Sequence, residues 1–139
     1  MSKDQSIDEL ASDLKEREII IWLTTTSRDL NPQPRPVWFI WHTEHFLIYS
    51  RPTSHKLRHI AERPNVSLNF NSDRDADENI VVFNGIARIA PEIAPAHEIS
   101  AYAEKYAEGI KGIGMNAEEF GLAYSVPILV AVQKTRGMA

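Results

Sequence analysis

The sequence has no cysteine among its 139 residues, and this absence removes several kinds of chemistry. Disulfides, thiolate metal sites and thiol nucleophiles all need a cysteine sulfur, so none of them can form here. The sequence also lacks the Gly-x-Ser-x-Gly of many hydrolases, the Walker phosphate-binding loop and the Gly-x-Gly-x-x-Gly of dinucleotide-binding domains. Any reaction must therefore rely on other side chains or on a bound cofactor.

Excess positive charge and long apolar runs are missing as well. The chain has 15 Lys and Arg against 19 Asp and Glu, a net charge of -4 at pH 7, whereas broad nucleic-acid binding needs a basic surface. No apolar stretch approaches the roughly 18 residues of a bilayer-spanning helix, and the polar N-terminus shows no secretory signal pattern. We therefore expect a cytoplasmic protein with neither a nucleic-acid nor a membrane partner.

The size and composition of the chain fit one globular domain over residues 1–139. Apolar residues make up 43% of the chain and charged residues 24%, which is close to ordinary soluble usage. Domains most often hold about 100 to 150 residues, so a second core is not expected.

The hydrophobic pattern predicts six strands, with helices between and around them. The strands are expected at residues 19–25, 34–41, 46–51, 66–71, 80–89 and 126–132, with a bulge at Gly85. The helices are expected at residues 7–17, 54–61, 94–109 and 117–122. Because the loop between the second and third strands is too short for a parallel crossover, the sheet should be mainly antiparallel and curled into a small barrel.

A basic cluster follows the third predicted strand. Arg51, Ser54 and Lys56 converge on the first turn of the next helix, where free backbone N–H groups favour an anion. One interpretation is a phosphate site. The alternative is a capped helix with two solvated surface cations, and the residues alone favour neither.

Two pairs of histidines have spacings that metal ligands also use. His55 and His59 are four residues apart on one predicted helix, and His42 and His45 flank a turn. Neither pair has a third or fourth ligand at a nearby spacing, so no metal site is predicted, and His55 is expected near the anion. The acidic run at residues 73–78 is expected to be a solvated loop.

Five short segments follow one another in a characteristic order. They are Pro36-Val-Trp-Phe39, Tyr49-Ser-Arg51, Ser54-His-Lys-Leu57, Arg63-Pro-Asn-Val-Ser-Leu68 and Asn84-Gly-Ile-Ala87. This series resembles the FMN-binding split-barrel family related to pyridoxamine 5'-phosphate oxidase and covers nearly the whole chain. The last third, with residues 103–108, 113–120 and 124–127, is most similar to the branch of deazaflavin-dependent enzymes.

The resemblance implies a mainly β (α+β) fold, a six-stranded antiparallel split β-barrel with peripheral helices that forms a homodimer. It also implies that FMN or an 8-hydroxy-5-deazaflavin coenzyme binds in a groove at the dimer interface. By position, the residues beside the cofactor ring would be Arg35, Pro36, Val37 and Trp38. Those around the ribityl chain and phosphate would be Tyr49, Ser50, Arg51, Ser54, Lys56 and Leu57. No catalytic residue is assigned, since the hydride chemistry would belong to the cofactor.

Two departures from the family pattern shape the functional prediction. His59 stands where relatives often have an asparagine, and residues 133–139 lack the basic groups that the true oxidases use for their phosphorylated vitamin substrate. We therefore expect an oxidoreductase acting on an unidentified small molecule, and not a pyridoxamine 5'-phosphate oxidase. The alternatives are a non-catalytic carrier or sensor of flavin, haem or another tetrapyrrole, and a structural dimer with an empty groove.

Overall fold

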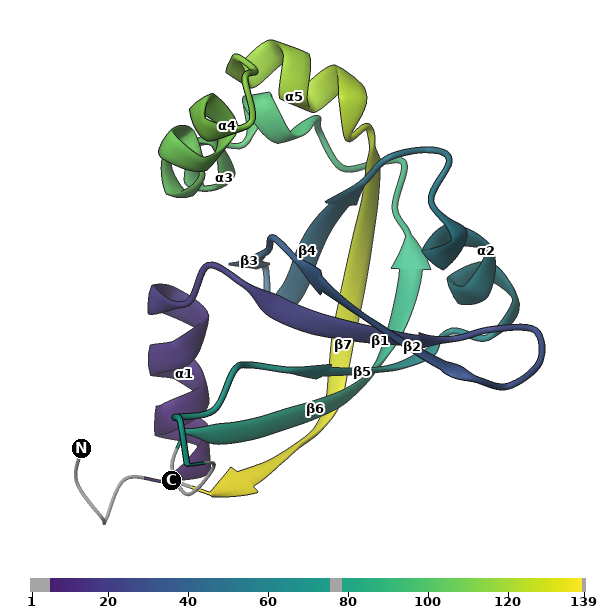
Figure 1. Cartoon of the computed structure of the whole chain (residues 1–139), viewed down its shortest axis with the longest axis vertical. Coiled ribbons are helices and arrows are strands. Elements are labelled where there is room, and N and C mark those ends of the chain that lie inside the picture. The colour runs from purple at the N-terminus through teal and green to yellow at the C-terminus, as the bar shows by residue number, and fades with distance from the viewer. Residues whose placement is uncertain (1–5, 76–78, 139) are drawn as a thin grey trace.

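The computed structural model describes residues 6–75 and 79–138 and contains a curled sheet with helices around it (Figure 1). The strands are β1 (Ile21–Thr26), β2 (Pro32–Val37), β3 (Ile40–His42), β4 (His45–Ser50), β5 (Asn65–Asn69), β6 (Ile80–Ile89) and β7 (Val126–Met138). The helices are α1 (Ile7–Arg17), α2 (His55–Glu62), the 3-10 turn η1 (Ala96–Glu98), α3 (Ser100–Lys105), α4 (Ala107–Gly112) and α5 (Ala117–Ala123).

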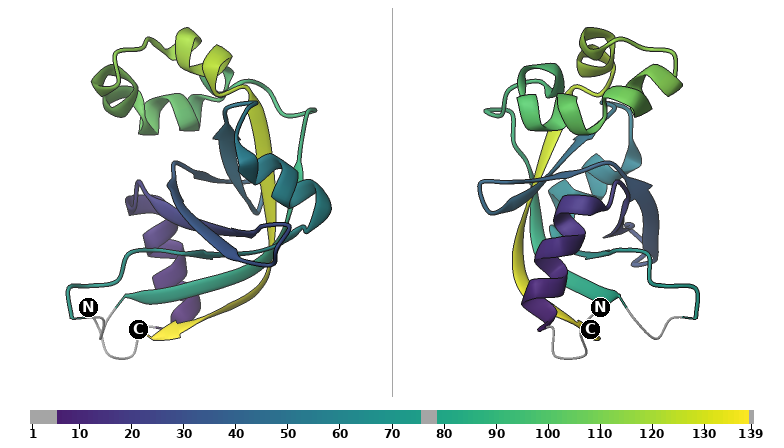
Figure 2. Two further views of the ribbon diagram at one scale, coloured as in Figure 1. Left: turned by 45° about the vertical axis from the view of Figure 1, so that its right-hand side comes forward. Right: turned by 90° about the vertical axis from the view of Figure 1, so that its left-hand side faces the viewer.

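All strand pairs in the sheet are antiparallel, and their order is β2-β1-β5-β6-β7-β4-β3. The sheet curls into a half-barrel, as the two further views in Figure 2 show. The predicted fold class, a mainly antiparallel split barrel with peripheral helices, is confirmed. The strand count is seven where six were expected.

The additional strand arises because the predicted strand at residues 34–41 is two strands at opposite edges of the sheet. β2 pairs with β1, whereas β3 pairs with β4 at the far end of the strand order. Only Trp38 and Phe39 join them, and we call these two residues the crossing. Three residue steps span at most about 11 Å, so the two edges must meet at this crossing. The short crossing therefore forces the sheet to curl.

Two hydrophobic cores lie on either side of the crossing. The barrel core contains Phe39, Phe46 and Phe83 together with Leu10 and Leu14 from α1. The second core lies between the ends of the strands and the helices that follow β6, and its partly buried members include Trp38. Adjacent residues of the crossing thus enter different cores.

The helices α1 and α2 begin where the sequence predicts. Ser6 accepts a hydrogen bond from the Glu9 N–H at 3.1 Å, which satisfies one free donor of the first turn. Ser54 occupies the N-cap position of α2, but its side chain does not cap the helix. In the described parts of the chain, no helix is long and apolar enough to cross a membrane.

The predicted helix at residues 94–109 is broken into η1, α3 and α4, which gather with α5 at one end of the half-barrel (Figure 2). The break between α3 and α4 falls at Tyr106. Its buried hydroxyl accepts a hydrogen bond from the Phe39 N–H at 2.8 Å and donates to the Ile19 carbonyl at 2.8 Å. This tyrosine therefore ties the helices to the crossing.

The last strand, β7, is longer than predicted. It pairs with β4 through residues 126–130 and with β6 through residues 128–138, so its polar second half is held by backbone pairing. Helix α5 starts at the predicted position, where Asn116 and Glu119 form a capping box. The predicted bulge is confirmed, because the β6–β7 register shifts between Asn84 and Gly85.

Candidate functional site

A cavity of about 480 Å³ opens where the crossing, the end of β4, the start of α2 and the helices after β6 meet. This volume is within the range of small-molecule sites, about 300 to 1,000 Å³. We call it the ligand cavity. Its lining residues are Ile20, Pro36, Val37, Trp38, Tyr49, Ser50, Arg51, Ser54, Lys56, Tyr102, Ile113, Phe120 and Tyr124.

Aromatic rings form one wall of the ligand cavity. Trp38 stacks on Tyr106, with ring centroids 4.6 Å apart and planes within 7°, and on Phe120 at 5.4 Å. Phe120 in turn stacks on Tyr124 at 4.5 Å. Gly109 keeps α4 close to this stack, because a Cβ there would lie 3.0 Å from the indole. The stacked rings make this wall apolar, which favours contact with an apolar ring system.

Two cations also line the ligand cavity, Arg51 and Lys56. The Arg51 guanidinium lies over the Tyr124 ring, 4.6 Å from its centroid. The Lys56 amine donates a hydrogen bond to Ser54 Oγ at 3.0 Å. Within residues 6–75 and 79–138, neither cation forms an ion pair with a carboxylate. Two unneutralised cations beside an aromatic wall suit a ligand with a flat ring and an anionic group.

The environment of Lys56 also favours an anion. Burial lowers the pKa of the Lys56 amine, and the nearby Arg35 charge lowers it further. Both effects raise the cost of the charged form, and a bound anion would offset them. The Ser54 hydroxyl lies between the helix start and this amine, which explains why it does not cap α2.

The polar side chains deeper in the ligand cavity have structural partners. Burial raises the pKa of Tyr49 to about 12, and its hydroxyl donates to the Ala94 carbonyl at 2.6 Å. The Ser50 hydroxyl donates to the Arg51 carbonyl at 2.9 Å. No carboxylate, imidazole or thiol is among the described residues that line the cavity. The ionisable side chains among them are Arg51, Lys56 and the three tyrosines Tyr49, Tyr102 and Tyr124.

The structure brings eight of the ten predicted site residues together around the ligand cavity: Pro36, Val37, Trp38, Tyr49, Ser50, Arg51, Ser54 and Lys56. Arg35 lines the neighbouring hollow, together with Ser54 and Lys56. Leu57 packs against the barrel core instead of the cavity. Whether these residues bind a cofactor remains a prediction.

Sequence reasoning missed the residues that close the cavity from the helical side, Tyr102, Ile113, Phe120 and Tyr124. Tyr102 was among the apolar positions of the predicted helix at residues 94–109, and the segment at residues 124–127 belonged to the family resemblance. No local spacing indicates that these residues face the end of β4. They reach it only through the turns between α3, α4 and α5.

The histidine pairs are separated from each other in the fold. The Nδ1 atom of His59 is hydrogen-bonded to Thr25 Oγ1 at 2.9 Å, and the Nδ1 atom of His45 to the Thr43 carbonyl at 2.8 Å. In the part of the chain that the structure describes, no three His, Asp or Glu side chains come together as metal ligands would. Residues 76–78 of the predicted acidic loop lie outside the described residues.

Comparison with protein families identifies one match that covers most of the chain. The family described as pyridoxamine 5'-phosphate oxidase matches residues 7–137. A comparison with curated proteins found no match.

Solved structures with the same fold include three whose names refer to a cofactor. An F420 reductase is 22% identical, with 90% of this chain and 94% of that chain covered and a TM-score of 0.67. A FAD-binding protein from Mesorhizobium loti is 13% identical, with coverages of 96% and 92% and a TM-score of 0.67. HutZ, the haem storage protein from Vibrio cholerae, is 11% identical, with coverages of 96% and 95% and a TM-score of 0.63. At these sequence identities the similarity shows only that the fold is shared.

Proposed function

The chain belongs to the pyridoxamine 5'-phosphate oxidase family, and from this we propose that its ligand cavity binds a flavin-type cofactor and that the protein is an oxidoreductase. The cofactor is FMN or a phosphorylated 8-hydroxy-5-deazaflavin coenzyme. The observation that carries the proposal is the pairing of an aromatic wall with two cations that lack carboxylate partners, Arg51 and Lys56.

The residues present fit both ends of such a cofactor. Arg51, Lys56 and the Ser54 hydroxyl offer donors for a phosphate, and charge-assisted hydrogen bonds of this kind contribute about 1.5 to 3 kcal/mol each. Trp38 and the backbone of residues 36–38 offer a flat surface for the ring. The aromatic wall supplies the apolar contact that phosphate binding alone does not provide.

When bound, a flavin or deazaflavin supplies the two-electron chemistry of hydride transfer. The chain's own residues then have three tasks: to hold the phosphate, to orient the ring and to keep water from it. The second reactant is an unidentified small molecule that would approach the open side of the cavity.

A non-catalytic role on the same fold is the second candidate. A haem storage protein shares the fold, and a FAD-binding protein does so as well. Haem iron is held by a side chain such as histidine, cysteine, methionine or tyrosine. Among the described residues that line the ligand cavity, the side chains of these types are Tyr49, whose hydroxyl donates a hydrogen bond to the Ala94 carbonyl, Tyr102 and Tyr124. Flavin storage without turnover would use the same two cations as the oxidoreductase, Arg51 and Lys56, and is therefore the form of this alternative that we favour.

A binding experiment tests the phosphate end of the cavity. The double variant Arg51→Ala/Lys56→Ala should bind FMN or the deazaflavin coenzyme at least about 100-fold more weakly, because it loses two charge-assisted contacts. Titration followed by fluorescence measures the affinity. The double variant Arg17→Ala/Lys134→Ala removes the same charge from exposed positions outside the cavity and should bind like the unmodified protein.

Turnover separates an enzyme from a carrier. The loaded protein should be reduced by a nicotinamide donor or reoxidised by at least one candidate acceptor at a rate above that of free cofactor. Binding without any such rate enhancement would support storage. A protein that binds neither cofactor would contradict both functions, and unchanged affinity in Arg51→Ala/Lys56→Ala would show that the phosphate lies elsewhere.

A further inference from the structure

A second hollow lies beside the ligand cavity, between α2 and the turn that joins β1 to β2. It consists of two overlapping cavities of about 430 and 400 Å³, which share Ser27, Asp29, His55 and His59. We call it the α2 trough. Its cationic lining residues are Arg28, Arg35, Lys56, Arg58 and Arg63.

The α2 trough concentrates positive charge in an acidic protein. Its five cations are a third of the 15 Lys and Arg in a chain of net charge -4. Two carboxylates, Asp29 and Glu62, also line it. In the described parts of the chain, the one ion pair within the trough joins Arg63 to Glu62 at 3.0 Å. The trough therefore keeps a net positive charge that the fold does not neutralise.

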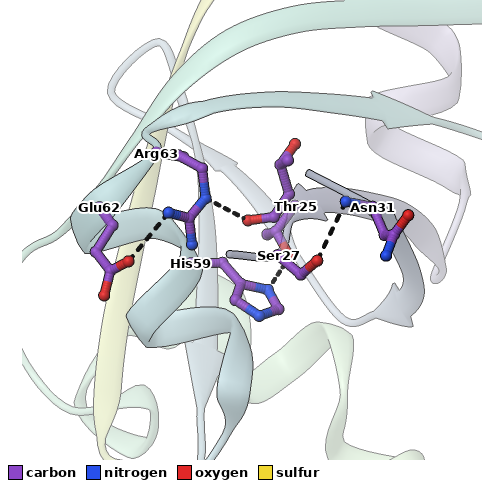
Figure 3. A network of polar contacts seen from close by, with 7 residues as sticks. Thr25, Ser27, Asn31, His59, Glu62 and Arg63 are labelled. Atoms are coloured by element: carbon purple, nitrogen blue, oxygen red, sulfur yellow. Dashed lines mark hydrogen bonds and ion pairs between the residues drawn. The ribbon is translucent and has the colours of Figure 1, made fainter. Parts of the chain in front are cut away.

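Figure 3 shows how the floor of the α2 trough is held in place. The Arg63 guanidinium donates from Nε to the Thr26 carbonyl at 2.9 Å and from Nη1 to Glu62 at 3.0 Å. Its third nitrogen, Nη2, is buried and has no hydrogen-bond partner. Burial lowers the pKa of the neighbouring His59, the charges of Arg63, His55 and Arg58 lower it further, and Glu62 raises it. An anion in the trough would offset the repulsion among these cations.

The α2 trough adjoins the ligand cavity. Ser54 and Lys56 line both, so an anion in the trough would lie next to a phosphate held beside Lys56. Arg35 marks this junction, and its charge contributes to the lowered pKa of Lys56. Arg28 and Arg58 lie further along, on the β1–β2 turn and on α2.

We propose that the α2 trough is a second anion-binding site, which accepts a diphosphate-sized polyanion distinct from the phosphate held by Arg51 and Lys56. Cations on both the β1–β2 turn and α2 can contact opposite sides of such a group. Two sources share this chemistry: a further phosphate that the bound cofactor carries beyond the one beside Lys56, and a free diphosphate. Only the first source depends on the proposed flavin function.

Calorimetric titration with inorganic pyrophosphate tests the site without any flavin. Pyrophosphate should bind in a salt-sensitive manner, with one molecule per chain in the trough besides any molecule held by Arg51 and Lys56. Arg28→Gln/Arg58→Gln should weaken this binding at least tenfold, whereas Arg51→Gln should leave it within twofold. Arg28 and Arg58 are exposed, so thermal melting should confirm that their replacement leaves the fold intact. Arg17→Gln/Lys134→Gln is the control for net charge.

The site would be refuted by any of three results: no pyrophosphate binding at millimolar concentration, unchanged binding in Arg28→Gln/Arg58→Gln, or a loss of binding in Arg51→Gln as large as in that variant. The last result would place the anion in the ligand cavity.

Comparison of FAD with FMN then identifies the source of the anion, because FAD carries one further phosphate and adenosine beyond the phosphate of FMN. If the anion in the trough belongs to the cofactor, FAD should bind at least tenfold more tightly than FMN, and Arg28→Gln/Arg58→Gln should remove this preference without changing FMN affinity. Equal affinities together with pyrophosphate binding would support a separate anion in the trough. Pyrophosphate binding without any flavin binding would refute the proposed function and support the second site.

Discussion

At the scale of single residues, the crossing at Trp38 and Phe39 is held by contacts from distant parts of the chain. The Lys105 amine donates to the Phe39 carbonyl at 3.0 Å and lies 3.7 Å from the centroid of the Phe39 ring. The Tyr106 hydroxyl accepts from the Phe39 N–H. Both backbone groups of Phe39 are thus satisfied by side chains near the junction of α3 and α4, because the crossing belongs to no strand that could pair them.

Lys105 should make the stability of the protein depend on pH. Burial lowers the pKa of its amine from 10.5 to about 8. Between these values the unfolded chain binds the proton more tightly than the folded one, so the free energy of unfolding should rise with pH. Urea unfolding at pH 7 to 10.5 should show the unmodified protein gaining stability relative to Lys105→Met across this window. The other lysines are common to both proteins, so their contributions cancel when the free energy of unfolding of the variant is subtracted from that of the unmodified protein. If this difference stayed constant or fell as the pH rises, the prediction would be contradicted.

At the scale of elements, β2 and β6 carry the sequence features with the clearest structural consequences. β2 contains Pro32, Pro34 and Pro36, which cannot donate backbone hydrogen bonds. Since β2 is paired with β1 on one side, the positions without N–H groups belong on its free side. The proline alternation marks β2 as an edge strand and discourages pairing with another chain there. This signal was present in the sequence and went unused.

Gly85 is required at the bulge of β6 because a side chain has no room there. A Cβ at this position would lie 2.6 Å from the Ala131 carbonyl oxygen and 2.9 Å from a methyl carbon of Val130. Gly85→Ala should therefore lower the free energy of unfolding by about 1 to 3 kcal/mol, measured by urea denaturation. Gly112→Ala is the matched control, because nothing lies within 4 Å of its Cβ position. A Gly85→Ala protein as stable as this control would argue against the close approach.

At the scale of the whole molecule, we propose that the protein is a homodimer in which a second copy covers the ligand cavity. Ile113 lines the cavity and is 49% exposed, so a second copy that covered the cavity would also bury this side chain. Sedimentation equilibrium should give a mass about twice 15.8 kDa. Ile113→Asp should shift the mass toward the monomer and weaken cofactor binding. Leu30→Asp, at an exposed turn outside the cavity, should leave both unchanged. A monomer at all concentrations would contradict the proposal.

Much of the fold could be predicted from local patterns. The bounds of α1 and β6, the start of α5 and the end of α2 before Pro64 follow from caps, alternation and proline sterics. Two elements were mispredicted for tertiary reasons. Residues 34–41 are rich in β-branched and aromatic residues, as in one strand, although a crossing divides them. Residues 94–109 have helical spacing, although the helix is interrupted at Tyr106, whose hydroxyl is hydrogen-bonded to Phe39.

The sequence by itself determined the antiparallel class, the positions of most elements and the cationic start of α2, because these depend on short-range periodicity, capping and charge. Only the tertiary structure decided that residues 38 and 39 join opposite edges of the sheet, and that the helices after β6 return to close the ligand cavity. It also decided that Arg28, Arg58 and Arg63 share the trough next to Lys56. These contacts are between residues far apart in the chain, so no local sequence pattern predicts them.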